Sequence, residues 1–114
     1  MGYKEALEAA GAKVLAFKEF GTWQGDWWAL VEYQGKRGWI HDYFGSCSGC
    51  DAFQAEFGWD EPTPQELAEF GKRYLDDIKT QEEAEQEVSE DIEWDLDAEE
   101  VLEFIKENGG MKHD

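Results

Sequence analysis

The sequence predicts a single α+β domain, in which a small three-stranded antiparallel sheet carries a short N-terminal helix and two to three acidic helices packed on one face of it. Two observations predict this class. Residues 26–50 gather aromatic and branched apolar residues into two short runs around a glycine-containing turn, which is typical of a β-hairpin core. The second half of the chain combines many acids with apolar residues at helical spacing. We expect one domain over 1–114, divided into a sheet part (1–58), a helical part (59–110) and a tail (111–114).

The first element is predicted to be a short helix over residues 3–10, which Gly11 ends. Apolar residues in 12–20 predict a strand, although alanine and lysine weaken the pattern. Residues 21–25 contain two glycines and predict a turn.

The next strand is predicted over residues 27–33, where both alternating faces are largely apolar. This pattern indicates a central strand. Residues 34–38 hold two glycines and predict a hairpin turn, and residues 39–44 form the return strand. Three sequential strands predict a meander.

A short helix is predicted over residues 51–57, with Phe53 and Phe57 four residues apart. Thr63 is the sharpest local signal, because Pro64 suits the first helical position and Glu66 completes a capping box.

The helix that starts after Thr63 has Leu67, Phe70, Tyr74 and Ile78 at helical spacing. We expect it to reach Lys79, and a continuation to about Val88 stays open.

Two more elements complete the chain. Residues 92–96 alternate apolar and acidic side chains, which predicts a short edge strand or an extended connector. Asp97 with Glu100 predicts the start of a last helix, which ends at 108–110.

The formal net charge is −18, and residues 59–114 carry 20 acids against five bases. Such a surface repels nucleic acid and anionic membranes and attracts basic partners. The first residues lack the apolar run of a signal peptide, and no window approaches a membrane span. We therefore expect a cytoplasmic protein that binds neither nucleic acid nor membrane and uses no cofactor.

Cys47 and Cys50 form a C-S-G-C motif between a predicted strand and a predicted helix. This local pattern resembles the active site of thioredoxin, where a helix N-terminus lowers the pKa of a thiol. That fold requires a strand–helix–strand unit before the motif and a proline that faces the thiols. Here the strands predict a meander, and the only prolines stand at 62 and 64.

A zinc site is the other interpretation of the motif, with His41 as a third ligand and Asp42 or Asp51 as a fourth. The simplest interpretation is that both cysteines are small residues in a tight turn. His41 could also act as a general base, but no Ser-His-Asp pattern accompanies it.

Acids at 91, 93, 95 and 97 alternate as at the start of an EF-hand loop. The match fails at the glycine and glutamate positions, which hold Leu96 and Leu102. Most aromatic residues are expected in the core, while Trp23, Trp59 and Trp94 fall in predicted loops and are candidate anchors at a protein interface.

From Glu82 to Glu100 there are eleven acids and no base. Charge runs usually form a solvated face. In one continuous helix, however, acids at 69, 76, 83 and 90 would form a stripe with a spacing of about 10 Å. The predicted partner-binding residues are Glu69, Asp76, Glu83, Glu87, Glu90, Asp91, Glu93, Trp94, Asp95 and Asp97.

These features favour a non-enzymatic acidic protein-binding module, present as a monomer or homodimer. A rigid array of carboxylates can stand in for the phosphates of a duplex and occupy the basic groove of a nucleic-acid-binding protein. In charge and size the chain is similar to the small DNA-mimic inhibitors that bacterial viruses carry against restriction or CRISPR effectors. Two alternatives are a small zinc- or thiol-dependent protein that uses Cys47 and Cys50, and a domain whose acidity reflects a high-salt environment.

Overall fold

The computed structural model describes residues 2–21, 25–45, 51–58, 60–93 and 97–109. Its centre is an antiparallel sheet of β1 (Lys13–Gly21), β2 (Gly25–Tyr33) and β3 (Lys36–Phe44) in the order β1-β2-β3. The predicted α+β class and the predicted meander are therefore confirmed. β2 is the central strand, and its Trp28 lies opposite Lys18 of β1 and His41 of β3.

The turn between β2 and β3 consists of Gln34 and Gly35, whose φ angles are 51° and 81°. Positive φ at both central residues is typical of the two-residue turn that matches the twist of a hairpin. This turn is tighter than the predicted 34–38 turn, so β3 begins at Lys36 and not at Trp39.

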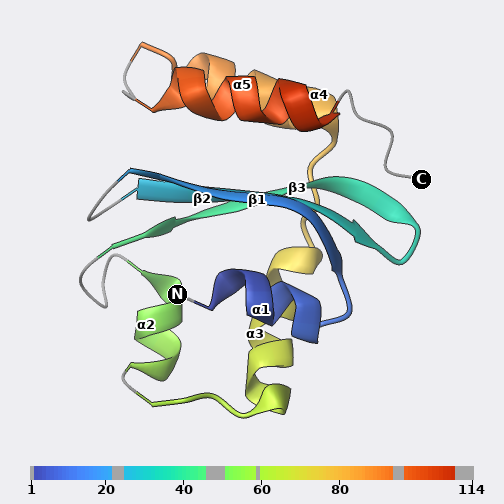
Figure 1. Ribbon diagram of the computed structural model, residues 1–114, viewed down its shortest axis with the longest axis vertical. Helices are drawn as coiled ribbons and strands as arrows, with labels where there is room; N and C mark the ends of the chain where they lie inside the picture. Colours follow the sequence, from blue (N-terminus) through green and yellow to red (C-terminus); the bar gives the residue numbers. More distant parts are fainter. Residues whose placement is uncertain (1, 22–24, 46–50, 59, 94–96, 110–114) are drawn as a thin grey trace.

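Three helices cover one face of the sheet: α1 (Tyr3–Ala9), α2 (Ala52–Phe57) and α3 (Pro64–Leu75) (Figure 1). Their positions agree with the predicted helix starts, and Thr63 and Glu66 form the predicted capping box of α3. The buried core between these helices and the sheet consists of Tyr3, Ala6, Leu7, Ala12, Trp27, Ala29, Val31, Ile40, Phe44, Phe57, Phe70 and Leu75.

Two helices, α4 (Gln81–Glu90) and α5 (Ala98–Gly109), lie side by side on the opposite face of the sheet (Figure 1). A second buried core lies beneath them and consists of Phe20, Trp28, Leu30, Trp39, Ala84, Val88, Ala98, Val101 and Ile105. The prediction that all acidic helices share one face was therefore wrong. The physical reason is that both faces of β2 are apolar, so helices must pack on each of them to exclude water.

The predicted continuation of α3 to Lys79 was also wrong. α3 ends at Leu75, and the chain then crosses the edge of the sheet, where Lys79 forms an antiparallel bridge with Trp39. The open option of one helix to Val88 is excluded as well, because a separate helix starts at Gln81.

The chain between the last two helices turns at residues 91–93. The edge strand expected over 92–96 is absent from the described part of that stretch, and residues 94–96 lie outside it. Throughout the described ranges, no helix combines the length and the apolar character needed to cross a membrane.

Candidate functional site

The start of α4 is fixed by a capping box that the sequence analysis did not identify. The hydroxyl of Thr80 accepts a hydrogen bond from the backbone N–H of Glu83 at 3.1 Å, and the Glu83 carboxylate accepts one from the backbone N–H of Thr80 at 3.0 Å. These hydrogen bonds lower the pKa of Glu83 below its ordinary value. Although Glu83 is exposed, its carboxylate is engaged in the capping box that begins α4.

The connector before α4 is held against the edge strand. Backbone hydrogen bonds join the N–H of Trp39 to the carbonyl of Lys79 at 2.7 Å and the N–H of Lys79 to the carbonyl of Trp39 at 2.9 Å. Gly38 allows this approach, because a Cβ there would lie 2.3 Å from the carbonyl oxygen of Lys79. The backbone thereby places the Lys79 side chain under α4.

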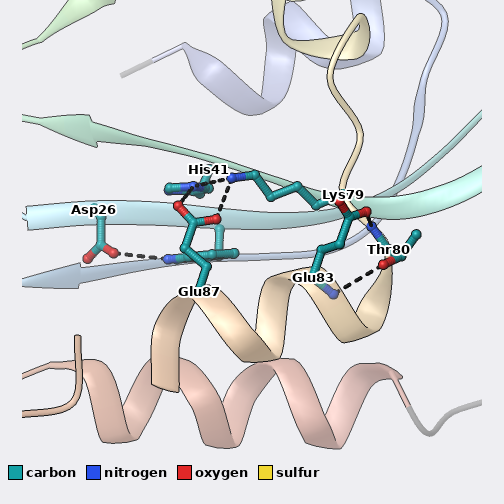
Figure 2. A network of polar contacts seen from close by, with 7 residues as sticks. Asp26, His41, Lys79, Thr80, Glu83 and Glu87 are labelled. Carbon is teal, nitrogen blue, oxygen red and sulfur yellow. Dashed lines mark hydrogen bonds and ion pairs between the residues drawn. The ribbon is translucent and has the colours of Figure 1, made fainter. Parts of the chain in front are cut away.

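Three polar side chains meet where β3, the connector and α4 converge (Figure 2). One carboxylate oxygen of Glu87 lies 3.1 Å from Nε2 of His41, and the other accepts a hydrogen bond from Nζ of Lys79. Nζ of Lys79 also lies 3.4 Å from Nε2 of His41. The imidazole stacks on Trp28 with ring centroids 4.1 Å apart, and the Trp28 indole N–H donates to Asp26 at 2.9 Å.

Burial sets the charge state of this network. It lowers the pKa of His41; the carboxylate of Glu87 opposes that shift and Lys79 adds to it. Burial alone would raise the pKa of Glu87, but the hydrogen bond from Lys79 and the neighbouring His41 outweigh it, so that the pKa lies below its ordinary value. At neutral pH the network is therefore a Lys79–Glu87 ion pair beside a neutral imidazole.

A cavity of about 30 Å³ lies beside the network, between the sheet and the acidic helices, and has His41, Glu87 and Asp91 in its wall. That volume suits one or two water molecules. Among the described residues that line it, there is no Ser, Thr or Cys that His41 could activate as a nucleophile. We interpret the network as a polar clamp that holds α4 on the sheet.

Residues 81–93 and 97–109, called here the acidic layer, form the outer surface that this clamp supports. The layer has twelve acids and one base, with five acids on α4, three between the helices and four on α5. Ten of the twelve are not engaged in the clamp or the capping box, and the exposed ones are Glu82, Glu90, Asp91, Glu93, Glu99, Glu100, Glu103 and Glu107.

The structure separates the predicted partner-binding residues into two groups. Glu69 and Asp76 are exposed on and just after α3, on the face of the sheet opposite the acidic layer. The predicted single stripe through 69, 76, 83 and 90 therefore does not exist, because it required one continuous helix. Glu87 turns inward to the clamp, and Trp94 and Asp95 lie outside the described residues.

Glu90, Asp91 and Glu93 remain exposed at the end of α4 and in the turn that follows it, and partly exposed Asp97 directly precedes α5. All four lie on the acidic layer, where their role as partner contacts stays a prediction, and Asp97 also occupies the position predicted for the helix start.

The described part of the predicted zinc site is not brought together. His41 contacts Trp28 and Glu87 beneath the acidic layer, whereas Asp42 accepts a hydrogen bond from the Tyr74 hydroxyl at 2.5 Å beneath the opposite helices. Buried Asp51 caps α2. Among the described residues no group of three or more His, Cys, Asp or Glu could hold a metal.

Other predicted site residues fall on undescribed positions. Cys47 and Cys50 lie outside the described residues, as do the predicted interface anchors Trp23 and Trp59.

Two further features of the site were not predicted from the sequence. Glu99, Glu103 and Glu107 follow one another at four-residue spacing on α5 and are all exposed, so that they form a row with about 6 Å between neighbours. That spacing was a signal available in the sequence. Lys79 carried no comparable signal, because its role depends on its pairing with β3.

Comparison with known proteins yields no relative: no protein-family model, no curated protein and no solved structure matches this chain. The acidic layer and the clamp beneath it are therefore the basis for a proposed function.

Proposed function

We propose that the chain is a non-enzymatic protein-binding module whose acidic layer docks in the basic groove of a nucleic-acid-binding protein, in the place of the nucleic acid. The observation that carries the proposal is the concentration of twelve acids against one base on a single helical layer. Like charges gathered in this way repel one another, and a cationic groove relieves that repulsion on binding.

The rigidity of the layer also supports the proposal. Its two helices share a buried core with the sheet, and the Lys79–Glu87 pair ties α4 to the edge strand. Carboxylates on a fixed scaffold keep their spacing, so less conformational entropy is lost when they meet fixed Lys and Arg side chains. A cytoplasmic location, expected from the sequence, fits a partner of this kind.

The test is capture of a partner from nuclease-treated lysate of the source cells, with elution by a salt gradient and mass spectrometry. We expect one nucleic-acid-binding protein that duplex DNA or RNA displaces and that moderate salt releases, because many ionic contacts break together as salt rises. Recovery of nothing, or only of generic basic proteins such as ribosomal ones, would contradict the proposal.

Matched charge reversals locate the surface. The triple variant Glu82→Lys, Glu90→Lys, Glu93→Lys changes three exposed acids of the acidic layer and spares the clamp and the capping box. The control, Glu69→Lys, Asp76→Lys, Asp77→Lys, makes the same charge change at exposed positions on and after α3. We expect the first variant to lose the partner and the second to keep it; equal loss in both would show that net charge alone is responsible.

A further inference from the structure

The outer surface of the acidic layer contains an open hollow that the charge pattern alone does not reveal. It has a volume of about 280 Å³, and Ile92 and Leu102 supply its apolar lining, called here the floor. Ile92, in the turn after α4, is 39% exposed and is one of two large hydrophobic residues that stand exposed in the described part of the chain.

The rim of the hollow is acidic. Glu99, Glu103 and Glu107 line it along α5, the helix drawn in red in Figure 1, and Lys106 is the one base in the described lining. Acids of like charge at four-residue spacing repel one another and destabilise a helix. This row therefore gains from any cation placed over the hollow.

We propose that the hollow receives one apolar side chain of the partner, flanked in the partner's sequence by Lys or Arg that pair with the three glutamates. The occupant follows from complementarity of two kinds: the apolar floor accepts an aliphatic or aromatic group, and the anionic rim selects cationic neighbours. A phosphate mimic in the strict sense needs only carboxylates, so the apolar floor adds a contact that a phosphate backbone does not make. This inference rests on the proposed function and specifies how the partner is recognised.

The experiment uses two synthetic probes of equal charge: a short lysine-rich peptide with one central leucine, and its twin with serine in place of that leucine. Titration calorimetry gives the affinity of each for the full chain. We expect the leucine peptide to bind roughly tenfold more tightly, as burial of a single leucine side chain allows. Equal affinities for the two peptides would overturn the proposal.

Variants separate the floor from the rim. Ile92→Ser should erase the preference for leucine and leave the affinity for the serine peptide unchanged. Tyr43→Ser removes the other exposed large hydrophobic residue, which lies outside the hollow, and should leave the preference intact. The triple variant Glu99→Gln, Glu103→Gln, Glu107→Gln should weaken both peptides alike. A leucine preference that survives Ile92→Ser would place the apolar contact elsewhere and refute the assignment.

Three further outcomes are informative. If sedimentation shows self-association that Ile92→Ser abolishes, a second copy of the chain occupies the hollow and the proposed occupant is wrong. If lysate capture yields a nucleic-acid-binding partner but the leucine preference is absent, this inference fails while the proposed function stands. If the preference is present and no such partner is captured, the proposed function fails while the hollow stands as a site for basic segments with an apolar anchor.

Discussion

The role of Glu87 in the structure differs from the role predicted for it from the sequence. In the sequence it is one acid among many, and we assigned it to the partner-binding surface. In the structure its carboxylate is only about a third exposed and accepts hydrogen bonds from beneath α4. Its contacts with Lys79 and His41 make it part of the support for the acidic layer. An acid that holds the layer in place is a poor choice for testing binding, since its loss would disturb both.

The pair that Glu87 forms with Lys79 yields a stability prediction. Lys79→Met keeps the length of the side chain but leaves the Glu87 carboxylate without its main partner. We expect a loss of about 1–3 kcal/mol in the free energy of unfolding, as for other charged groups that lose a partner while partly buried. Urea denaturation at pH 7 measures it. Lys72→Met, at an exposed lysine of α3, is the control and should change stability by less than about 0.5 kcal/mol.

The imidazole of the same network predicts a pH dependence. Since the folded pKa of His41 is lowered, the unfolded chain takes up the proton first, near pH 6.5. His41 therefore contributes stability that is complete above about pH 6.5 and is lost as the pH falls through its folded pKa. The groups that face it are Glu87, Lys79 and Asp26.

The measurement compares the free energy of unfolding of the wild type and His41→Gln across this range. Because protonation of the many surface acids affects both proteins, the difference between them isolates His41. We expect the wild type to lose more stability on acidification, and parallel curves would contradict the assigned shift.

At the level of elements, the start of α3 was predicted correctly from the sequence, but its end and the start of α4 were not. Thr63 correctly predicted the start of α3, because a capping box is a local interaction between residues three apart. The same signal was present at Thr80 with Glu83. The capping signal at Thr80 was not used in the prediction, because Tyr74 and Ile78 continue the helical spacing of apolar residues past the end of α3 at Leu75. Beyond the end of α3, Lys79 instead forms a bridge with Trp39, a contact between residues forty apart that no local pattern encodes.

The capping box of α4 gives the prediction for this scale. Thr80→Ala removes the hydroxyl acceptor and should lower stability by about 1 kcal/mol. Thr63→Ala is its natural counterpart in α3 and should cost about the same. Hydrogen exchange distinguishes the two: Thr80→Ala should increase exchange in α4, and Thr63→Ala in α3. Increased exchange spread evenly over both helices would contradict separate helix starts.

The placement of helices on the two faces of the sheet was also predicted only in part. The apolar character of both faces of β2 correctly predicted a central strand, and the alternation of Trp27 with Trp28 was visible in the sequence. That alternation also implies helices on both faces, whereas the prediction placed the two to three acidic helices on one face. The candidate site was predicted only in part: acids of α4 and of the turn after it were named, but the acidic row on α5 and the inward direction of Glu87 were not.

For the whole molecule, the net charge of −18 predicts a dependence of stability on salt. Screening shortens the reach of repulsion from about 30 Å at 0.01 M to about 3 Å at 1 M ionic strength. We expect the free energy of unfolding to rise over this range while the protein stays folded at the low-salt end. Chemical denaturation by urea at several NaCl concentrations measures the rise.

A charge-reduced variant checks the cause. Glu82→Lys, Glu90→Lys, Glu93→Lys should show a weaker salt dependence than the wild type, because its acidic layer repels itself less. Unfolding at low salt would instead favour the high-salt origin of the acidity.

The presence of two cores on opposite sides of one sheet has a consequence for how the molecule tolerates change. Phe70 belongs to one core and Ile105 to the other, and the sheet lies between them. Residues without shared neighbours contribute independently to stability, so the effects of Phe70→Leu and Ile105→Val should add to within about 0.5 kcal/mol in the double variant. A larger coupling would contradict this separation. Substitutions can then accumulate in the acidic layer without compensating changes in the helices on the other side.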